Sequence, residues 1–251
     1  MRLRMKKLFV ILALIIVANA NQAEAKTVLK KTHVAPQNVL EADADDEYAD
    51  SDPIEPINRA IFKFNQVVDG VALKPVSQIY RGVVPQWGRD RVSNFLYNVS
   101  EPVTVVNSVF QGDPENAFTS VWRFIINTTF GVLGTFDAAT EIGLKPRKED
   151  FGQTLAVWGV GEGPYIVLPI IGPSSGRDTV GLGVDYATNP INWGRYTDSE
   201  ERVALYVAKA IDTRTSILDI TDDIERTSLD PYASYRSLYL QKRRADARNG
   251  K

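Results

Sequence analysis

The sequence predicts a mainly α-helical domain, and three observations support this prediction. Beyond residue 52, apolar side chains recur three or four positions apart through most of the chain, which is the helical period. Several of these segments begin with Asp or Ser, often followed by Pro, as helix starts do. Strand signals are weak, because no long period-two alternation occurs and Gly or Pro interrupts the Val-rich segments. No internal repeat is visible, so residues 52–251 are expected to form one domain.

The N-terminal part of the chain differs from the rest in composition. Residues 1–25 have the pattern of a secretory signal peptide, with a basic start, an apolar stretch and a small-residue cleavage site at Ala23–Ala25. We expect cleavage after Ala25, with a site after Ala20 as the alternative, and hence an exported protein. The apolar stretch is shorter than the ~20 residues of a membrane-spanning helix. Residues 26–51 predict a disordered acidic linker, since few apolar residues accompany its charges.

Composition argues against several kinds of functional site. The formal net charge of −2 does not suit a nucleic-acid binder that relies on a basic surface. The chain has no cysteine, and its one histidine, His33, lies in the linker. Catalytic triads usually need a His base, and zinc sites need His or Cys clusters. We therefore predict no metal, no cofactor and no catalysis. The acidic pairs Glu200–Glu201 and Asp222–Asp223 leave a carboxylate-based hydrolase as an alternative, although capping and solvation explain both pairs.

The first helix is expected to start with Asp52 as its N-cap and Pro53 in its first turn, and to run to about Val71. Its apolar residues share one face and its basic residues another, so the helix is amphipathic. Such a helix suits either a membrane interface or packing on a core, and the pattern alone leaves both open. A short helix is expected within residues 73–87.

Three helical segments follow. Residues 88–96 and 103–110 are predicted as separate helices, and Gly112–Pro114 forms a stop-and-start signal before a helix over residues 115–130. This last helix is apolar on nearly all sides, so it lies either in the centre of a large core or against lipid. Its Arg123 needs a carboxylate or a lipid phosphate as partner, and we favour a structural ion pair.

The C-terminal part predicts three more helices. Residues 174–178 have the capping signature of a helix over residues 179–187, whose glycines allow another backbone to approach closely. A long helix is expected over residues 200–219. Asp230–Pro231 begins the final helix, residues 232–248, which carries tyrosines and ends in basic residues. These basic residues either complement the helix dipole or dock an acidic partner or an anionic surface.

The stretch from Phe151 to Pro173 is almost wholly apolar but contains five glycines and three prolines. It cannot be one straight helix, since an interior Gly costs ~1 kcal/mol and an interior Pro ~3 kcal/mol. We predict a hairpin of two short apolar arms that meet at the Gly-rich bend around Gly159–Pro164. At membrane depth, such irregular backbone requires surrounding protein or a cavity. A buried turn in an ordinary core is the alternative.

Six segments of the chain form an ordered set of motifs. They are DPIEPINRAIFKFN (Asp52–Asn65), NFLYNVSEP (Asn94–Pro102), NSVFQGD (Asn107–Asp113), RFIINTTFG (Arg123–Gly131), FGQTLAVWGVGEGPYIVLP (Phe151–Pro169) and DPYASYR (Asp230–Arg236). With these motifs, about Asp52 to Lys242 resembles the MlaA/VacJ family of outer-membrane phospholipid-transport proteins.

This resemblance implies a ring of helices in the periplasmic leaflet of the outer membrane, around a central amphipathic channel. Mislocalised phospholipid from the outer leaflet would pass through the channel to a soluble periplasmic carrier, and a trimeric porin would be the membrane partner. By motif match, the channel-side hairpin holds Gly159, Gly161, Gly163, Pro164 and Tyr165. Asn58, Phe62 and Asn65 fall on the helix that helps to fix the membrane position. Tyr235, Tyr239 and Arg243 fall where carrier contact is expected.

One feature departs from the family pattern. Family members are commonly lipoproteins with a cysteine after the signal peptide, and this chain has no cysteine. Anchoring would then depend on the apolar helix faces or on a partner, although a single acyl chain gives only marginal membrane binding anyway. The alternative function is an envelope scaffold or adaptor that binds a porin without transporting lipid.

Overall fold

The computed structural model describes residues 52–193 and 198–248. The predicted signal peptide (1–25) and acidic linker (26–51), with His33, lie outside the described residues. The described elements are α2 (Glu55–Val68), η3 (Asp69–Leu73, a π-helical turn), α3 (Lys74–Val83), α4 (Gln86–Phe110), α5 (Pro114–Thr129), α6 (Ala138–Glu141), α7 (Phe151–Val157), β1 (Tyr165–Leu168), β2 (Gly172–Ser175), α8 (Gly176–Thr188), η4 (Pro190–Trp193, a 3₁₀ turn), α9 (Ser199–Ser216), α10 (Leu218–Thr227) and α11 (Pro231–Ala247).

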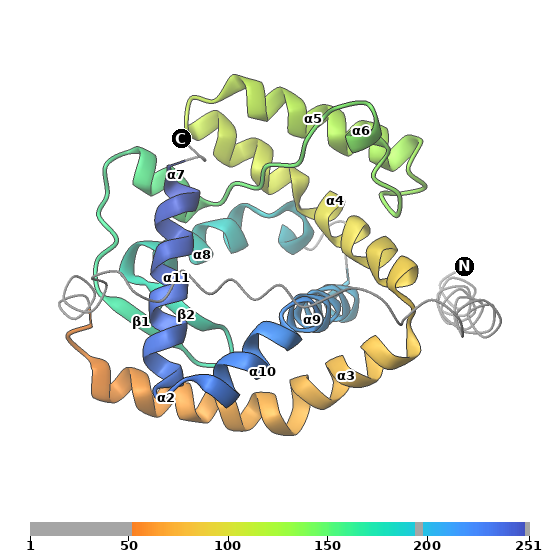
Figure 1. The fold of residues 1–251 in the computed structure, drawn as a ribbon. Coiled ribbons are helices and arrows are strands. Elements are labelled where there is room, and N and C mark those ends of the chain that lie inside the picture. The colour runs from red at the N-terminus through yellow and green to blue at the C-terminus, as the bar shows by residue number, and fades with distance from the viewer. Residues whose placement is uncertain (1–51, 194–197, 249–251) are drawn as a thin grey trace.

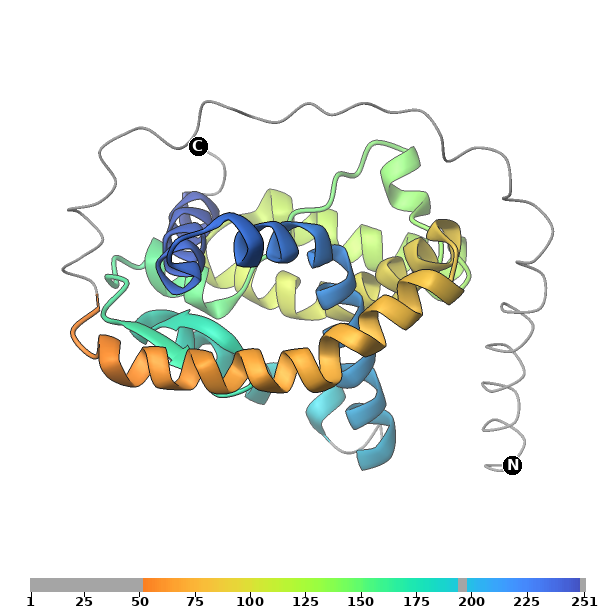
Figure 2. The same cartoon turned by 60° about the horizontal axis from the view of Figure 1, so that its bottom comes forward.

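The prediction of a mainly α-helical fold is confirmed. Within the described ranges, the one sheet is the antiparallel pair β1–β2, in which Tyr165 lies opposite Ser175 and Leu168 opposite Gly172. Figure 1 shows α2, α3, α4 and α5 following one another around the outside of the molecule, with α8 and α9 inside this ring and α11 crossing the hairpin. In Figure 2, α2 and α3 form a nearly continuous edge, and η4 with the start of α9 projects beyond it.

Most predicted helix starts are confirmed because N-capping is a local interaction. The carboxylates of Asp113 and Asp230 and the hydroxyl of Ser175 accept a hydrogen bond from the backbone N–H three residues later, and Asp198 forms a capping box with Glu201. The prediction for Asp52 is wrong. Its carboxylate does not cap α2 but lies buried, where the side chains of Asn58 and Tyr232 donate to it.

Two predicted helix boundaries are also wrong. Residues 88–96 and 103–110 form one continuous helix, α4, which runs through Pro102. Packing of α4 along α5 buries polar residues on both sides of Pro102, and this tertiary contact offsets the local cost of the proline. The predicted helix over residues 200–219 ends instead at Ser216, and α10 begins at Leu218.

The helix α5 is held to α4 by a buried ion pair. Arg123 Nε lies 2.8 Å from Glu101 Oε1, and Arg123 Nη2 lies 3.1 Å from Asp137 Oδ2. Both Arg123 and Glu101 are almost completely buried. The structural role predicted for Arg123 is therefore confirmed.

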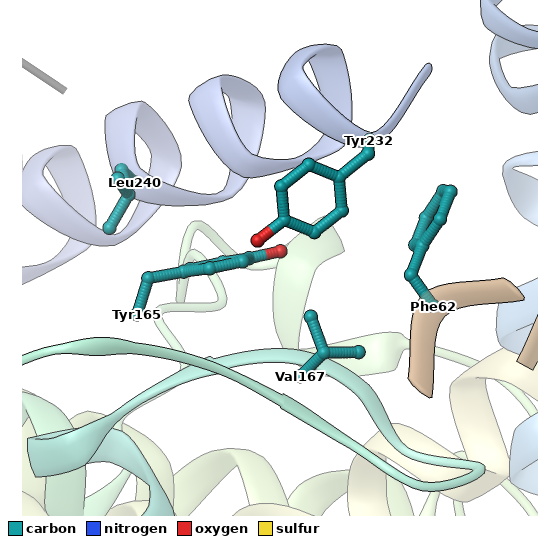
Figure 3. Packing of buried hydrophobic residues seen from close by; sticks show 5 residues of the cluster. All are labelled: Phe62, Tyr165, Val167, Tyr232 and Leu240. Carbon is teal, nitrogen blue, oxygen red and sulfur yellow. The ribbon is translucent and has the colours of Figure 1, made fainter. Parts of the chain in front are cut away.

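The apolar core is small and lies between the hairpin, α2 and α11. It consists of Phe62, Tyr165, Val167, Tyr232 and Leu240, and Figure 3 shows the Tyr165 and Tyr232 rings between the strands and α11. The ring centroids of Phe62 and Tyr232 are 5.5 Å apart in an edge-to-face arrangement, which stabilises the packing of α2 against α11. This core fixes the position of the hairpin relative to α2 and α11.

Candidate functional site

The predicted hairpin exists, but its reversal lies elsewhere. The chain turns at Pro169–Ile171, between β1 and β2, and not at the Gly-rich segment. The first predicted arm is the helix α7, which starts with a capping box between Asp150 and Gln153. The Gly-rich segment 158–164 is instead a loop that joins α7 to β1. The turn was missed because Ile170, a β-branched residue, has a positive φ of 68°, which side chains of this type rarely adopt.

The glycines of the 158–164 loop differ in what they allow. Gly159 and Gly163 have φ values of 87° and 67°, so a side chain at either position is strained. Gly161 has an ordinary φ, and a Cβ built on it meets no atom within 4 Å. The end of the loop is fastened to the start of α8, because Gly176 N–H donates to the Pro164 carbonyl. A side chain at Gly161 is therefore compatible with the fold.

Two asparagines of α2 hold the hairpin from one side. Asn58 donates to the carbonyl of Tyr165 at 2.9 Å and accepts from the N–H of Val167 at 2.9 Å. Asn65, two turns later, donates to the carbonyl of Leu168 at 2.9 Å and accepts from the N–H of Ile170 at 2.7 Å. Each amide thus replaces the neighbouring strand that β1 lacks on this edge.

The final helix, α11, holds the same segment from the other side. Tyr239 donates to Asp178 Oδ2 at 2.6 Å, and Arg243 donates to both oxygens of Asp150 and of Asp178 at 2.7 to 2.9 Å. Burial alone would raise the pKa of Asp178, but donation from Arg243 and Tyr239 lowers it below its usual value. Next to this cluster, Arg244 Nε lies 3.0 Å from Glu162 Oε1 in the Gly-rich loop.

The three groups of residues predicted from separate motifs therefore meet around one hairpin. Phe62 of the first group and Tyr235 of the third have ring centroids 5.5 Å apart, and Tyr165 and Tyr239 have centroids 6.1 Å apart. Asn58 and Tyr165 are completely buried. Gly159, Gly161, Gly163 and Pro164 are exposed. Of the predicted site residues, these four alone are exposed to solvent, and the others are buried or half-buried.

Sequence reasoning missed the acidic partners of this site. Asp52, Asp150 and Asp178 receive the hydrogen bonds from α2 and α11. Each looks in the sequence like a helix cap or a surface charge, and the partners of Asp150 and Asp178 lie 93 and 61 to 65 residues away. The repeated Asp-Pro signature at residues 52–53 and 230–231 was the available signal, but it predicts capping only.

The distribution of polarity in the described residues is the reverse of that in an ordinary soluble domain. Most of the buried side chains are polar, whereas large apolar side chains are exposed along α2, α3, α5, α8 and α9. Phe118 of α5 is 68% exposed, and Phe130, the residue directly after α5, is 79% exposed. Large apolar side chains exposed in such numbers mark an interaction site for protein or lipid. We call the exposed side chains Ile57, Phe64, Val67, Phe118, Trp122, Ile125 and Phe130 the apolar belt.

Two features are absent from the described residues. None of the described helices combines the length and hydropathy needed to cross a membrane. Residues 52–193 and 198–248 contain no group of three or more His, Cys, Asp or Glu side chains arranged to hold a metal ion.

Comparison with known proteins identifies relatives across the described domain. A family model described as MlaA lipoprotein matches residues 50–246. An uncharacterised protein of Rickettsia bellii is 42% identical over 195 residues, which cover 77% of this chain and 76% of that protein. The intermembrane phospholipid transport system lipoprotein MlaA of Escherichia coli is 36% identical over 201 residues, or 78% of each chain.

The fold agrees with that of a solved protein structure. That structure was described as the structural basis for maintenance of bacterial outer membrane lipid asymmetry. It superimposes with a TM-score of 0.67 at 34% identity and covers 78% of this chain and 99% of its own. The family model, the identities and the shared fold all extend over more than two thirds of the chain. The chain therefore belongs to the MlaA lipoprotein family.

Proposed function

We propose that this protein is a non-catalytic component of phospholipid transport at the periplasmic face of the outer membrane. It removes mislocalised phospholipid from the outer leaflet and passes it through the space inside the helix ring to a soluble periplasmic carrier, which maintains lipid asymmetry. Membership of the MlaA lipoprotein family and the names of the relatives support this proposal.

The observation that carries the proposal is the apolar belt combined with a polar interior. In water, a protein that leaves side chains such as Phe118, Trp122 and Phe130 exposed lacks the ~1.5–3 kcal/mol of stabilisation that burying each one would give. Placed among lipid tails, the same side chains do not carry this cost, and buried polar side chains such as Asn58 and Arg123 keep their hydrogen bonds inside the protein. The helices then lie in the plane of one leaflet, as amphipathic interfacial helices do.

The hairpin and its supports give the proposed transport a physical basis. The exposed loop Gly159–Pro164 borders the hairpin, and its glycines allow backbone movement that other residues restrict. We propose that this loop contacts phospholipid, that α2 with Asn58, Phe62 and Asn65 sets the depth of the hairpin, and that α11 with Tyr235, Tyr239 and Arg243 forms the carrier side. An outer-membrane porin is the proposed membrane partner, which covers part of the apolar belt.

Lipid analysis of the purified protein tests the proposal. The chain is extracted in mild detergent, and co-purified phospholipid is quantified by mass spectrometry. We expect near-stoichiometric phospholipid in wild type. We expect less of it in Gly161→Trp, because the bulky side chain stands on the loop that is proposed to contact phospholipid. The fold itself should be kept, since Gly161 accepts a side chain without strain. A lipid-free, water-soluble monomer would overturn the proposal.

A porin scaffold that transports nothing is the second candidate, because the apolar belt also suits a protein partner. The same Gly161→Trp variant separates the two functions. A scaffold retains its phenotype and its porin when Gly161 is replaced, whereas a transporter loses lipid asymmetry while the porin stays bound.

A further inference from the structure

A surface cavity of about 730 Å³ lies where the C-terminal end of α11 meets the turn between α4 and α5. Figure 1 shows this end of α11 beside α7, against which α11 packs. Four charged side chains line the cavity, namely Asp113, Glu115, Arg147 and Arg248. None of the predicted site residues lines it. Its volume is within the range of small-molecule sites in proteins, and its charges indicate a polar ligand.

Two of the four charges are occupied within the protein. Arg147 Nη2 donates to Asp113 Oδ2, and Arg147 Nε lies 3.3 Å from Oε1 of the buried Glu149. Asp113 also accepts from the N–H of Asn116 as the N-cap of α5. These contacts hold the segment before α7 against the start of α5. Arg147 and Asp113 therefore form part of the wall of the cavity.

The other two charges, Glu115 and Arg248, are available to a ligand. Both side chains are exposed, and neither has an ion-pair partner among residues 52–193 and 198–248. Arg248 Nε donates to the carbonyl of Arg244 at 3.1 Å, which positions the guanidinium and leaves its two terminal nitrogens for other acceptors. The cavity thus has a cation on α11's end and an anion in the first turn of α5.

An aromatic surface adjoins the cavity. Gln111 and Val157, which line the cavity, directly follow Phe110 and precede Trp158 in the chain. Trp158 Nε1 donates to the carbonyl of Phe110 at 2.9 Å, and the two ring centroids are 6.3 Å apart. Both rings are about half exposed. Because Trp158 begins the Gly-rich loop 158–164, the cavity lies next to the loop that is proposed to contact phospholipid.

We propose that this cavity binds the headgroup of a zwitterionic phospholipid, with Arg248 on the phosphodiester and Glu115 on the ammonium group. This inference rests on the proposed function and names the class of lipid that it handles. A guanidinium donates charge-assisted hydrogen bonds to phosphate oxygens, and a carboxylate accepts them from a primary ammonium group. The glycerol and the start of the acyl chains then lie on Phe110 and Trp158. A headgroup without an amine uses only the arginine, so the site prefers phosphoethanolamine.

The test measures binding of three probes to the detergent-solubilised protein: a short-chain phosphatidylethanolamine, the phosphatidylglycerol with the same chains, and free phosphoethanolamine. Wild type should prefer phosphatidylethanolamine. Glu115→Gln should weaken the binding of this lipid about tenfold and leave phosphatidylglycerol unchanged. Arg248→Gln should weaken both lipids about tenfold, and Arg248→Lys should retain most of the affinity. Glu141→Gln on α6 and Arg226→Gln on α10, both exposed, are the matched controls.

The outcomes separate this inference from the proposed function. If wild type binds neither phospholipid, the proposed function itself fails. If wild type binds both lipids and the Glu115 and Arg248 variants bind them as wild type does, the headgroup site alone is overturned. Equal weakening of both lipids by Glu115→Gln would contradict a contact with the ammonium group. If free phosphoethanolamine binds as tightly as the lipid, the cavity takes a soluble zwitterion and the headgroup assignment is wrong.

Discussion

Asn58 and Asn65 make the same pair of hydrogen bonds to the hairpin and differ mainly in burial. Asn58 is completely buried, whereas Asn65 is half-buried and its partner Ile170 is exposed. A buried backbone group without a partner costs more than an exposed one, which water can satisfy.

We predict that Asn58→Ala lowers the free energy of unfolding by about 2–3 kcal/mol and Asn65→Ala by about 1 kcal/mol. Denaturant titration in mild detergent measures both values, and each variant is the control for the other. Equal losses would show that the amides do not act through the backbone groups of β1.

Arg123 and Glu101 form the most deeply buried ion pair of the described residues. Arg123→Leu leaves the Glu101 carboxylate buried without its cation, and we expect a loss of about 3–5 kcal/mol. The double variant Glu101→Leu/Arg123→Leu removes both charges, so it should be more stable than Arg123→Leu alone. Thermal unfolding of the three proteins measures this difference. A double variant less stable than the single would contradict the account.

At the scale of elements, α11 is joined to α7 and α8 through Arg243. The pKa values of Asp150 and Asp178 are lowered in the folded protein. A carboxylate of this kind stabilises the fold fully above its unfolded pKa of ~3.9, and the contribution is lost progressively as the pH falls from that value through the lower folded-state pKa. The stabilisation that Arg243 gives through these two aspartates is therefore fully present at neutral pH.

We predict that Arg243→Gln lowers stability by about 3 kcal/mol at pH 7 and exposes the amides of α11 to hydrogen exchange. The difference from wild type should shrink progressively as the pH falls below about 4, since the aspartates of the unfolded chain are protonated first and those of the folded protein only at a lower pH. Lys242→Gln, at the exposed neighbouring position, is the control. A loss that is independent of pH would contradict the role of the aspartates.

The elements that could be predicted from sequence are those defined by neighbouring residues. Asp113, Ser175 and Asp230 cap helices through contacts three residues long, so their positions were correct. The uninterrupted α4 depends on packing against α5, which no local pattern records. The partners of Asn58 in β1 lie 107 and 109 residues away, so the site residues were found by resemblance but their contacts were not.

At the scale of the whole molecule, the apolar belt should contribute to membrane binding and not to folding. We predict that replacing Phe118, Trp122 and Phe130 together by Ser changes the unfolding free energy little. The same variant should bind phospholipid vesicles at least tenfold more weakly, because each lost side chain contributes about 1.5–3 kcal/mol in an apolar environment. Vesicle co-sedimentation measures this, with Asp219→Ser on α10 as control. Unchanged vesicle binding would assign the belt to a protein partner.

The most direct test of the proposed function is the amount of phospholipid in the outer leaflet of living cells. Intact cells that lack the gene for this chain are labelled with a membrane-impermeant amine reagent, and labelled phospholipid is quantified against cells that carry wild type or Gly161→Trp. The account predicts that labelled phospholipid rises without the protein, returns to the original level with wild type and stays raised with Gly161→Trp. Equal labelling with and without the protein would contradict a role in removing phospholipid from the outer leaflet.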